Sequence, residues 1–356
     1  MEASTRLFSP LKIRDIEFRN RLFVSPMCQY SADQGIPNDW HLVHLGSRAV
    51  GGAGLVMTEA TSVAPEGRIS PTDTGLWTNQ QAEAFRKITA FLKTHGAVPA
   101  IQLAHAGRKA STAAPWNGGK PLSAAEGGWP VLAPSNIPFA LGYPTPKVMT
   151  EENITGIAKQ FEESTTRAIA AGFEVVEIHM AHGYLLHEFL SPLSNRRSDQ
   201  FGGSLDNRMR FPLMVARMIR GACPKHLPVF VRVSATDWSP GGWDLDQTIA
   251  FSRELKNIGV DFIDVSTGGL VSDAKIPVEA GFQVPFSREI RKSVGIMTGA
   301  VGMITNGQQA ERILQDDSAD AILMARELLR DPYFPLHAAR ELGVTVSWPK
   351  QYERAR

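Results

Sequence analysis

Eight short runs rich in β-branched and other apolar residues recur along the chain, without the strict alternation of apolar and polar positions that marks a half-exposed strand. Runs of this kind are typical of parallel strands whose two faces are both covered. They are RLFVS (21–25), GLVMTE (54–59), VPAIQL (98–103), VVEIH (175–179), PVFVRV (228–233), DFIDVS (261–266), GIMTGA (295–300) and DAILMA (320–325).

Amphipathic helical patterns separate most of these runs. In the first pattern the apolar residues at 85, 88, 91 and 92 share one face, and a glycine ends it. Strands that alternate with helices eight times predict an α/β fold, a single (β/α)8 TIM barrel over residues 1–356. A doubly wound sheet is the alternative, but no Gly-x-Gly-x-x-Gly sequence follows an early strand, so a Rossmann nucleotide site is unsupported. The clearest helical patterns cover residues 81–96, 246–259 and 306–317.

Two connections are longer than ordinary βα loops. Residues 107–150 are rich in proline and glycine, and residues 180–207 form the second long connection. Because both follow strands, they belong to the C-terminal face of the barrel, where active sites form. We expect 107–150 to be a lid or hairpin excursion, with a surface decoration as the alternative. A helix should begin after it, where Thr150 and Asn153 imitate a capping box only weakly.

The charge and cysteine content narrow the class of protein. The formal net charge is +1, which gives no electrostatic reason to expect nucleic acid or an anionic membrane as a partner. No apolar run approaches the length of a membrane span, and the N-terminus lacks the apolar core of a signal peptide. Two cysteines, Cys28 and Cys223, cannot build a disulfide framework or an iron–sulfur cluster. These features predict a cytoplasmic enzyme with free thiols.

Polar residues stand where the predicted strands end, and the loops after the last two strands form the usual phosphate site of a barrel. The whole set suits a phosphorylated planar cofactor such as flavin mononucleotide (FMN), because an amide can pair with its pyrimidine edge and a cation can stabilise its N1–C2=O group. In chain order the residues are Cys28 and Tyr30, Ala60, Gln102 with His105, Arg108 and Lys109, then His179, His182 and Tyr184, Arg232, Val301–Gly302, Ala325 and Arg326.

The His179–His182 spacing also permits a zinc site, which would need a third ligand and a base. Candidates exist, but none has a recognisable spacing from the pair, and the second HxxH sequence suits histidines packed at a helix start. Without a third ligand, two imidazole donors suit a carbonyl oxygen that gains negative charge, and Tyr184 beside them can supply a proton. The zinc candidates are Glu59, His105, His41, His44 and Asp264, of which His41 and His44 form the second HxxH sequence.

Five motifs carry a resemblance to the Old Yellow Enzyme family of FMN-dependent ene-reductases, across essentially the whole chain. The first motif and the terminal QYER (351–354) are similar to the bacterial subgroup of NADPH dehydrogenases and xenobiotic reductases. The motifs are SPMCQY (25–30), QLAHAGRKAS (102–111), EIHMAHGYLLHEFLSPLSNRRSDQFGGSLDNRMRF (177–211), AVGMITNG (300–307) and RELLRDPYF (326–334).

The resemblance implies a role for each matching residue. His179 and His182 would bind the substrate carbonyl, with Tyr30 assisting and Tyr184 donating the proton. Alanine stands at 325 where the family usually has glycine, so the phosphate contact could be crowded. The loop with Asn195, Arg196, Arg197, Asp199, Gly202 and Gly203 would hold the histidine loop through turns and ion pairs. The flavin wall would be Ser25, Pro26, Met27 and Cys28, its polar edge would meet Ala60, Gln102 and Arg232, and its phosphate would meet Gly302, Ala325 and Arg326.

The resemblance implies noncovalent FMN, NADPH as reductant, and ping-pong reduction of the activated C=C bond of enones and similar small electrophilic alkenes, including nitro compounds. A zinc-dependent barrel hydrolase and a non-catalytic flavin-binding barrel are the alternatives. It also implies a homodimer or higher oligomer, in which the C-terminal tail (348–356) reaches a neighbouring subunit and places Arg354 in its substrate pocket. Arg356 could compete for that role, and a frayed tail is the alternative.

Overall fold

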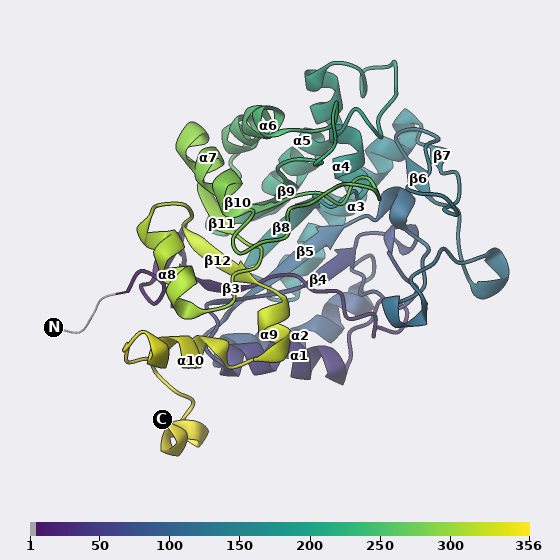
Figure 1. Cartoon of the computed structure of the whole chain (residues 1–356). Helices are drawn as coiled ribbons and strands as arrows, with labels where there is room; N and C mark the ends of the chain where they lie inside the picture. The colour runs from purple at the N-terminus through teal and green to yellow at the C-terminus, as the bar shows by residue number, and fades with distance from the viewer. Residues whose placement is uncertain (1–4) are drawn as a thin grey trace.

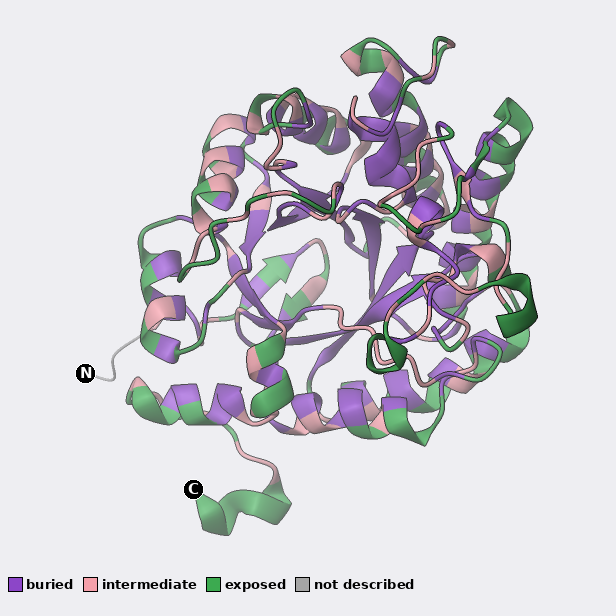
Figure 2. Ribbon diagram, turned by 45° about the vertical axis from the view of Figure 1, so that its right-hand side comes forward, coloured by how far each residue is buried: buried purple, intermediate pink, exposed green. Residues whose placement is uncertain are grey.

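The computed structural model describes residues 5–356, and its core is a closed barrel of eight parallel strands (Figure 2). The last strand pairs with the first, which closes the barrel. All eight predicted strands are confirmed, and so is the predicted fold class. In barrel order they are β3 (Leu22–Val24), β4 (Leu55–Ser62), β5 (Val98–Ala104), β8 (Val175–Met180), β9 (Val229–Ser234), β10 (Phe262–Ser266), β11 (Met297–Ala300) and β12 (Ala321–Met324).

Helices cover the outside of the barrel (Figure 1). The three helices predicted from amphipathic patterns are present, and each begins and ends within two residues of the prediction. The outer helices are α1 (Asp39–Val50), α2 (Asn79–Thr94), α3 (Glu151–Ala170), α5 (Leu205–Ala222), α6 (Leu245–Ile258), α7 (Val284–Val294), α8 (Gly307–Gln315) and α10 (Phe334–Glu341), and the short α4 (Leu185–Leu190) and α9 (Arg326–Arg330) lie in loops after strands.

The start of α3 corrects one expectation. Thr150 and Asn153 form a complete capping box, in which each side chain accepts a hydrogen bond from the other residue's backbone N–H, at 3.2 and 3.0 Å. The Asn153 amide oxygen therefore does what Glu or Gln does at this position in the usual motif. The helix that leads into the strand with the two histidines is consequently well anchored at its first turn.

A small N-terminal hairpin, absent from the prediction, covers the N-terminal end of the barrel. Its strands β1 (Leu11–Ile13) and β2 (Ile16–Phe18) pair antiparallel, and Phe18 packs 4.9 Å from the ring of Phe23 inside the barrel. Strands of three residues are too short to show a period, which is why the pattern missed them. Because this hairpin closes the N-terminal end, the C-terminal face is the open end of the barrel interior.

The excursion after β5 lies on that open face. Its two short strands, β6 (Leu132–Ala133) and β7 (Lys147–Val148), pair in parallel, so the segment is not a β-hairpin, and its role as a lid stays a prediction. Arg197 ties it to the second long loop by donating to the carbonyl oxygens of Pro134 and Met149. Within residues 5–356, no helix has the length and apolar character needed to cross a membrane.

The second long loop, residues 180–207, contains the turns and the ion pair that the resemblance implies. Arg197 forms an ion pair with Asp199, and the Asn195 amide donates to the carbonyl oxygens of Phe189 and Phe201, both at 2.8 Å. Gly203 has a φ of 80°, a conformation that glycine adopts without steric cost. These contacts stabilise the loop after β8, which carries His182.

Candidate active site

A layer of buried polar side chains crosses the interior near the C-terminal ends of the strands. Gln102 on β5 faces Glu177 on β8, and Arg232 on β9 faces Asp264 on β10, in register across neighbouring strands. Gln102 Nε2 donates to Glu177 Oε1 at 2.8 Å, and Arg232 Nε lies 3.0 Å from Asp264 Oδ2. Burial, and next the Asp264 carboxylate, raise the pKa of Glu177 well above its ordinary value. The layer thus pairs one cation with Asp264, and the raised pKa favours the neutral form of Glu177.

The sequence placed two members of this layer correctly in one neighbourhood but missed their partners. Gln102 and Arg232 were expected at a cofactor's polar edge, whereas Glu177 was unnoticed and Asp264 appeared only as a zinc candidate. A signal for Glu177 existed: it stands two residues before His179 in an otherwise apolar strand, and residues two apart share a face.

Above this layer the aromatic rings of three predicted residues meet. The His179 ring lies 5.2 Å from that of His182 and 5.0 Å from that of Tyr184. Burial, and next the positive charge of Arg232, lower the pKa of both imidazoles well below the ordinary value, so both are neutral at pH 7. The buried Nδ1 of His179 has no hydrogen-bond partner in the described part of the chain, and His182 Nε2 lies 2.7 Å from Ser266 Oγ.

A second aromatic wall comes from the loop after β3. Cys28 and Tyr30 of this loop are both half-buried, and the Tyr30 ring meets Trp116 of the excursion edge-on, with the ring centroids 5.6 Å apart. Burial raises the pKa of the Cys28 thiol, which therefore stays protonated. Burial, and next Cys28 and Tyr30, raise the pKa of Tyr184, which keeps its phenolic proton at neutral pH.

The loop that carries Cys28 is held by His41, for which the sequence predicts a packing role, and by Glu59, which it gives only as a zinc candidate. His41 Nε2 lies 3.1 Å from Glu59 Oε1, and Glu59 Oε2 accepts the N–H of Gln29 at 2.9 Å. His41 Nδ1 also accepts the N–H of Asn38, which completes the capping box of α1. His41 therefore has the structural role expected of it at the start of the helix. Through Glu59 it also helps to hold the loop that carries Cys28 in the candidate site.

The remaining residues of the expected flavin wall lie at the same end of the barrel. Ser25 is fully buried, donates its N–H to Met324 O at 2.9 Å, and has an unpartnered hydroxyl among the described residues. Pro26, Met27 and Cys28 are half-buried, and Ala60 is buried opposite Gln102 in the β4–β5 register.

Gly302, Ala325 and Arg326 line one cavity of about 160 Å³ at the ends of β11 and β12, as predicted for a phosphate, and Arg330 lines it too. Gly302 has a φ of 110°, and a Cβ there would lie 2.6 Å from Gln283 Nε2, so the position requires glycine. Ala325 has a φ of −111°, outside the left-handed region that favours glycine, so a positive φ does not require glycine at this position.

These features fit a flavin mononucleotide across the barrel mouth. A phosphate-sized cavity with two arginines lies at one side, and unpartnered buried polar atoms of Ser25, Glu177 and His179 lie in the interior. The zinc alternative fits less well, because residues 5–356 hold no group of three His, Cys, Asp or Glu side chains placed around a metal ion. Arg354 is not brought to the site: it lies exposed in the C-terminal tail, on η5 (Lys350–Ala355).

Comparisons with known proteins agree with this geometry. Residues 6–344 match the NADH:flavin oxidoreductase / NADH oxidase family. The chain is 47% identical over 352 residues to an NADPH dehydrogenase of Geobacillus sp. (strain WCH70), covering 98% of each chain, and 46% identical over 353 residues to one of Listeria monocytogenes, covering 99% of each. Morphinone reductase in complex with tetrahydroNAD superposes with a TM-score of 0.79 at 25% identity, over 97% of this chain and 92% of that one. The chain belongs to the NADH:flavin oxidoreductase / NADH oxidase family of FMN-binding oxidoreductases, which confirms the Old Yellow Enzyme resemblance of its motifs.

Proposed function

We propose that the protein is an NADPH-dependent ene-reductase, which reduces the activated C=C bond of α,β-unsaturated carbonyl or nitro compounds in a ping-pong cycle. The observation that carries this proposal is the meeting of two neutral imidazoles and a protonated phenol, His179, His182 and Tyr184, above the polar layer. The name NADPH dehydrogenase of the relatives supports NADPH as the reductant.

The chain's residues divide the binding of FMN among three regions. When bound, FMN supplies the site that accepts hydride from the nicotinamide and passes it to the alkene. Backbone N–H groups near Gly302 and Ala325, with the Arg326 guanidinium, would hold the phosphate. Gln102, Arg232 and Ala60 would meet the polar edge of the ring, and Ser25, Pro26, Met27 and Cys28 would form its wall.

The histidines act on the activating group of the substrate. A neutral imidazole donates one N–H, so His179 and His182 together can offer two donors to a carbonyl or nitro oxygen that gains negative charge. Each well-placed donor stabilises such an oxyanion by on the order of 3 kcal/mol. Tyr30 borders the same pocket, and Tyr184 retains its proton at neutral pH and delivers it to Cα.

We further propose that the active form is a homodimer or higher homo-oligomer. The exposed tail with Arg354 extends away from the barrel beside α10 (Figure 1), where a second copy can meet it. An arginine that enters the substrate pocket of a neighbouring subunit would complete a site shared by two chains.

The experiment is an anaerobic titration of the purified protein. Chromophore released by acid should run as FMN, NADPH should bleach the bound flavin, and cyclohexenone should restore the colour. A colourless protein with one tightly bound zinc ion per chain would contradict the proposal in favour of a hydrolase. A flavin that NADPH bleaches but no enone restores would instead show that the alkene substrate is wrong, and a flavin that NADPH does not bleach would indicate a binding barrel without this activity.

A further inference from the structure

The peptide unit between His182 and Gly183 is held from both ends. Lys109 Nζ donates to the carbonyl oxygen of His182 at 2.8 Å, and the N–H of Gly183 donates to Nδ1 of His187 at 2.9 Å. The N–H of His182 is held as well, by Ser234 Oγ at 2.9 Å. This turn therefore has its backbone groups fixed on either side of the catalytic imidazole.

The turn needs such restraint because its backbone is strained. His182 has a φ of 59°, a left-handed conformation that is uncommon for a residue with a Cβ, and Gly183 follows with 71°. A Cβ at Gly183 would lie 2.2 Å from the carbonyl oxygen of Gly269, so the turn also packs closely against the loop after β10. A change in this peptide unit would move His182 and Tyr184 together, because His182 lies directly before it and Tyr184 follows Gly183 after it.

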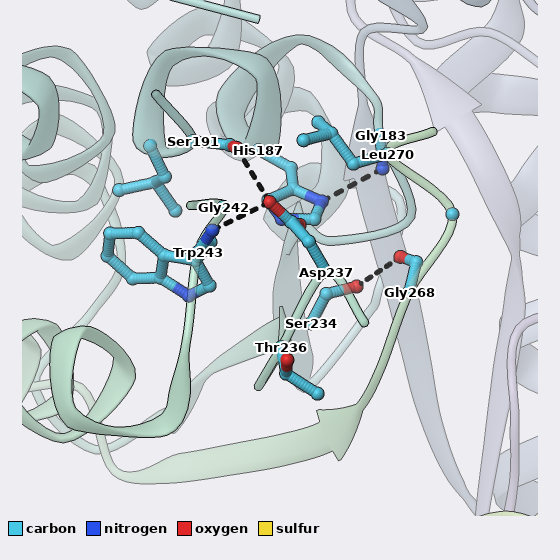
Figure 3. A network of polar contacts seen from close by, with 12 residues as sticks. Gly183, His187, Ser191, Ser234, Thr236, Asp237, Gly242, Trp243, Gly268 and Leu270 are labelled. Carbon is cyan, nitrogen blue, oxygen red and sulfur yellow. Dashed lines mark hydrogen bonds and ion pairs between the residues drawn. The ribbon is translucent and has the colours of Figure 1, made fainter. Parts of the chain in front are cut away.

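His187 and Asp237 lie behind the turn, fully buried (Figure 3). Since His187 Nδ1 accepts the Gly183 N–H, its proton belongs on Nε2, which lies 3.0 Å from Asp237 Oδ1. The other oxygen, Oδ2, accepts the Trp243 N–H at 2.7 Å and the Ser191 hydroxyl at 2.6 Å. Asp237 thus has donors on both oxygens, and its carboxylate suits a protonated Nε2.

We propose that Asp237 and His187 are positioning residues of the active site: Asp237 fixes the proton of His187 on Nε2, so that Nδ1 remains the acceptor which holds the His182–Gly183 peptide and, through it, the His182 and Tyr184 side chains. The consequence for catalysis rests on the proposed function. The tautomer itself is a property of the fold and can be measured separately.

The substitution Asp237→Asn tests the proposal because it keeps the shape and changes the hydrogen bonding. The fixed Trp243 N–H requires the amide oxygen at the Oδ2 position, so the amide NH2 faces His187 Nε2. His187 Nε2 must then accept a hydrogen bond from this NH2 group, so the His187 proton moves to Nδ1. The proton on Nδ1 then faces the N–H of Gly183. Because both groups are donors, the hydrogen bond that supports the turn is lost.

The first readout is the 15N spectrum of histidine-labelled protein, which separates protonated from unprotonated ring nitrogens. We expect His187 of the wild type to carry its proton on Nε2 and that of Asp237→Asn to carry it on Nδ1. The matched control is Ser191→Ala, which removes one donor from the same carboxylate but leaves Nε2 facing an oxygen, and it should keep the wild-type tautomer. A wild type with the proton on Nδ1, or an Asp237→Asn protein with it on Nε2, overturns the proposal.

The second readout is affinity for 4-chlorophenol, followed by the change in flavin absorbance, together with the rate of the enone half-reaction. Residues that orient the histidine ligands of metal sites typically change affinity or activity by 10- to 100-fold, and by analogy Asp237→Asn should weaken phenol binding at least tenfold with the FMN content per chain unchanged. Ser191→Ala should stay within about threefold. Equal losses in both variants would show a merely structural effect and overturn the proposal.

A second pair of variants covers the case in which Asp237→Asn does not fold. His187→Asn retains an oxygen that can accept the Gly183 N–H, whereas His187→Leu has similar size and no acceptor. Phenol affinity should be retained in the first and lost in the second; equal affinities would overturn the proposal. A wild type that neither binds the phenol nor reduces enones would contradict the proposed function instead, and the tautomer measurement would still decide this inference.

Discussion

Glu177 Oε1 accepts a hydrogen bond of 2.8 Å from Gln102 Nε2 in the interior of the barrel. With Nε2 as the donor to Glu177, the carbonyl oxygen of the Gln102 amide is left as an acceptor for another group. Burial, and next Asp264, raise the pKa of Glu177, which favours its neutral form. The orientation of the amide that we assign to the flavin edge is thus set by a residue on the neighbouring strand.

This relationship predicts a difference between two substitutions at residue 177. Glu177→Gln keeps an acceptor and matches the neutral form of the acid, so the free energy of unfolding should change by less than about 1 kcal/mol. Glu177→Leu leaves the Gln102 N–H group buried without a partner, which costs about 1–3 kcal/mol and should weaken FMN binding. Urea denaturation and FMN titration of the apoprotein measure both effects. A Gln variant as impaired as the Leu variant would show that Glu177 is ionised.

Alanine at His179 or at His182 should separate substrate binding from cofactor binding. Each substitution removes one donor from the proposed oxyanion site, so phenol affinity and the rate of the enone half-reaction should fall by roughly 100-fold. FMN retention should change much less, because the proposed phosphate cavity lies around Gly302 and Arg326. If His182→Ala lost its flavin and kept normal enone turnover, the role given to the histidine would be wrong.

The barrel itself could be predicted because its signals are local. Each strand is a continuous apolar run, and each helix has an apolar face with the right period, so eight strands and the outer helices follow from short windows of sequence. The ends of these strands then gather His179, Arg232 and Gln102 on one face without further information. The hairpin of β1 and β2 could not be predicted in this way, because strands of three residues are too short to show a period.

The partners of the site residues could not be predicted in the same way. The Gln102–Glu177 bond depends on the register between two strands, and the His187–Asp237 contact joins residues 50 positions apart. Register and loop packing are set by the whole fold rather than by a window of sequence. Glu177 carried a visible signal as an acid inside an apolar strand, whereas nothing local distinguishes Asp237 from a loop carboxylate.

Cys28 should tune the flavin without taking part in covalent chemistry. Burial raises the pKa of the thiol well above its ordinary value, so the thiol stays protonated and is a poor nucleophile. Cys28→Ala should therefore shift the flavin reduction potential and the Michaelis constants while the protein stays active, as spectroelectrochemistry and steady-state kinetics can show. Cys223, buried near the end of α5, offers a control position where Ala should leave the potential unchanged. Complete inactivation of Cys28→Ala with FMN still bound would indicate a nucleophile.

Lys109 predicts a pH dependence of the enone half-reaction. Burial lowers the pKa of Lys109 to about 8, so its ammonium is present below pH 8 and is lost as the pH rises through that value. The charged form donates to His182 O and Gly269 O at 2.8 and 3.1 Å. Loss of the charge should slow the reaction roughly tenfold, the effect of about 1.5 kcal/mol from one charge-assisted hydrogen bond. Stopped-flow rates between pH 6 and 10 test this.

Glu188 provides the necessary comparison, because burial raises its pKa to about 8 as well. Lys109→Met should lower the rate and abolish the transition near pH 8, while Glu188→Gln should retain it. The opposite result, a transition that persists without Lys109 and disappears without Glu188, would assign the titration to the carboxyl group.

The C-terminal tail is exposed and makes few contacts with its own barrel. Its residues 350–356 are exposed, and the Tyr352 ring touches the barrel edge-on at Tyr333, 6.1 Å away. Arg356 lines a hollow on its own chain with Arg340 and Trp348, whereas Arg354 does not line it. Of the two arginines that compete for the role, Arg354 is therefore the one free to enter a neighbouring subunit.

Truncation after Pro349 should raise the Michaelis constant for enones by about tenfold, the loss of one charge-assisted contact to a substrate oxygen. The barrel should remain folded with normal FMN content, because the removed residues are all exposed and lie outside the barrel core. Arg354→Ala should reproduce most of this effect, and Arg356→Ala should not, which separates the two arginines. Size-exclusion mass, measured on the same samples, shows whether the tail also contributes to assembly. A truncated protein with full activity and an unchanged Michaelis constant would rule out a shared site formed by this tail, whether or not the protein remains a dimer.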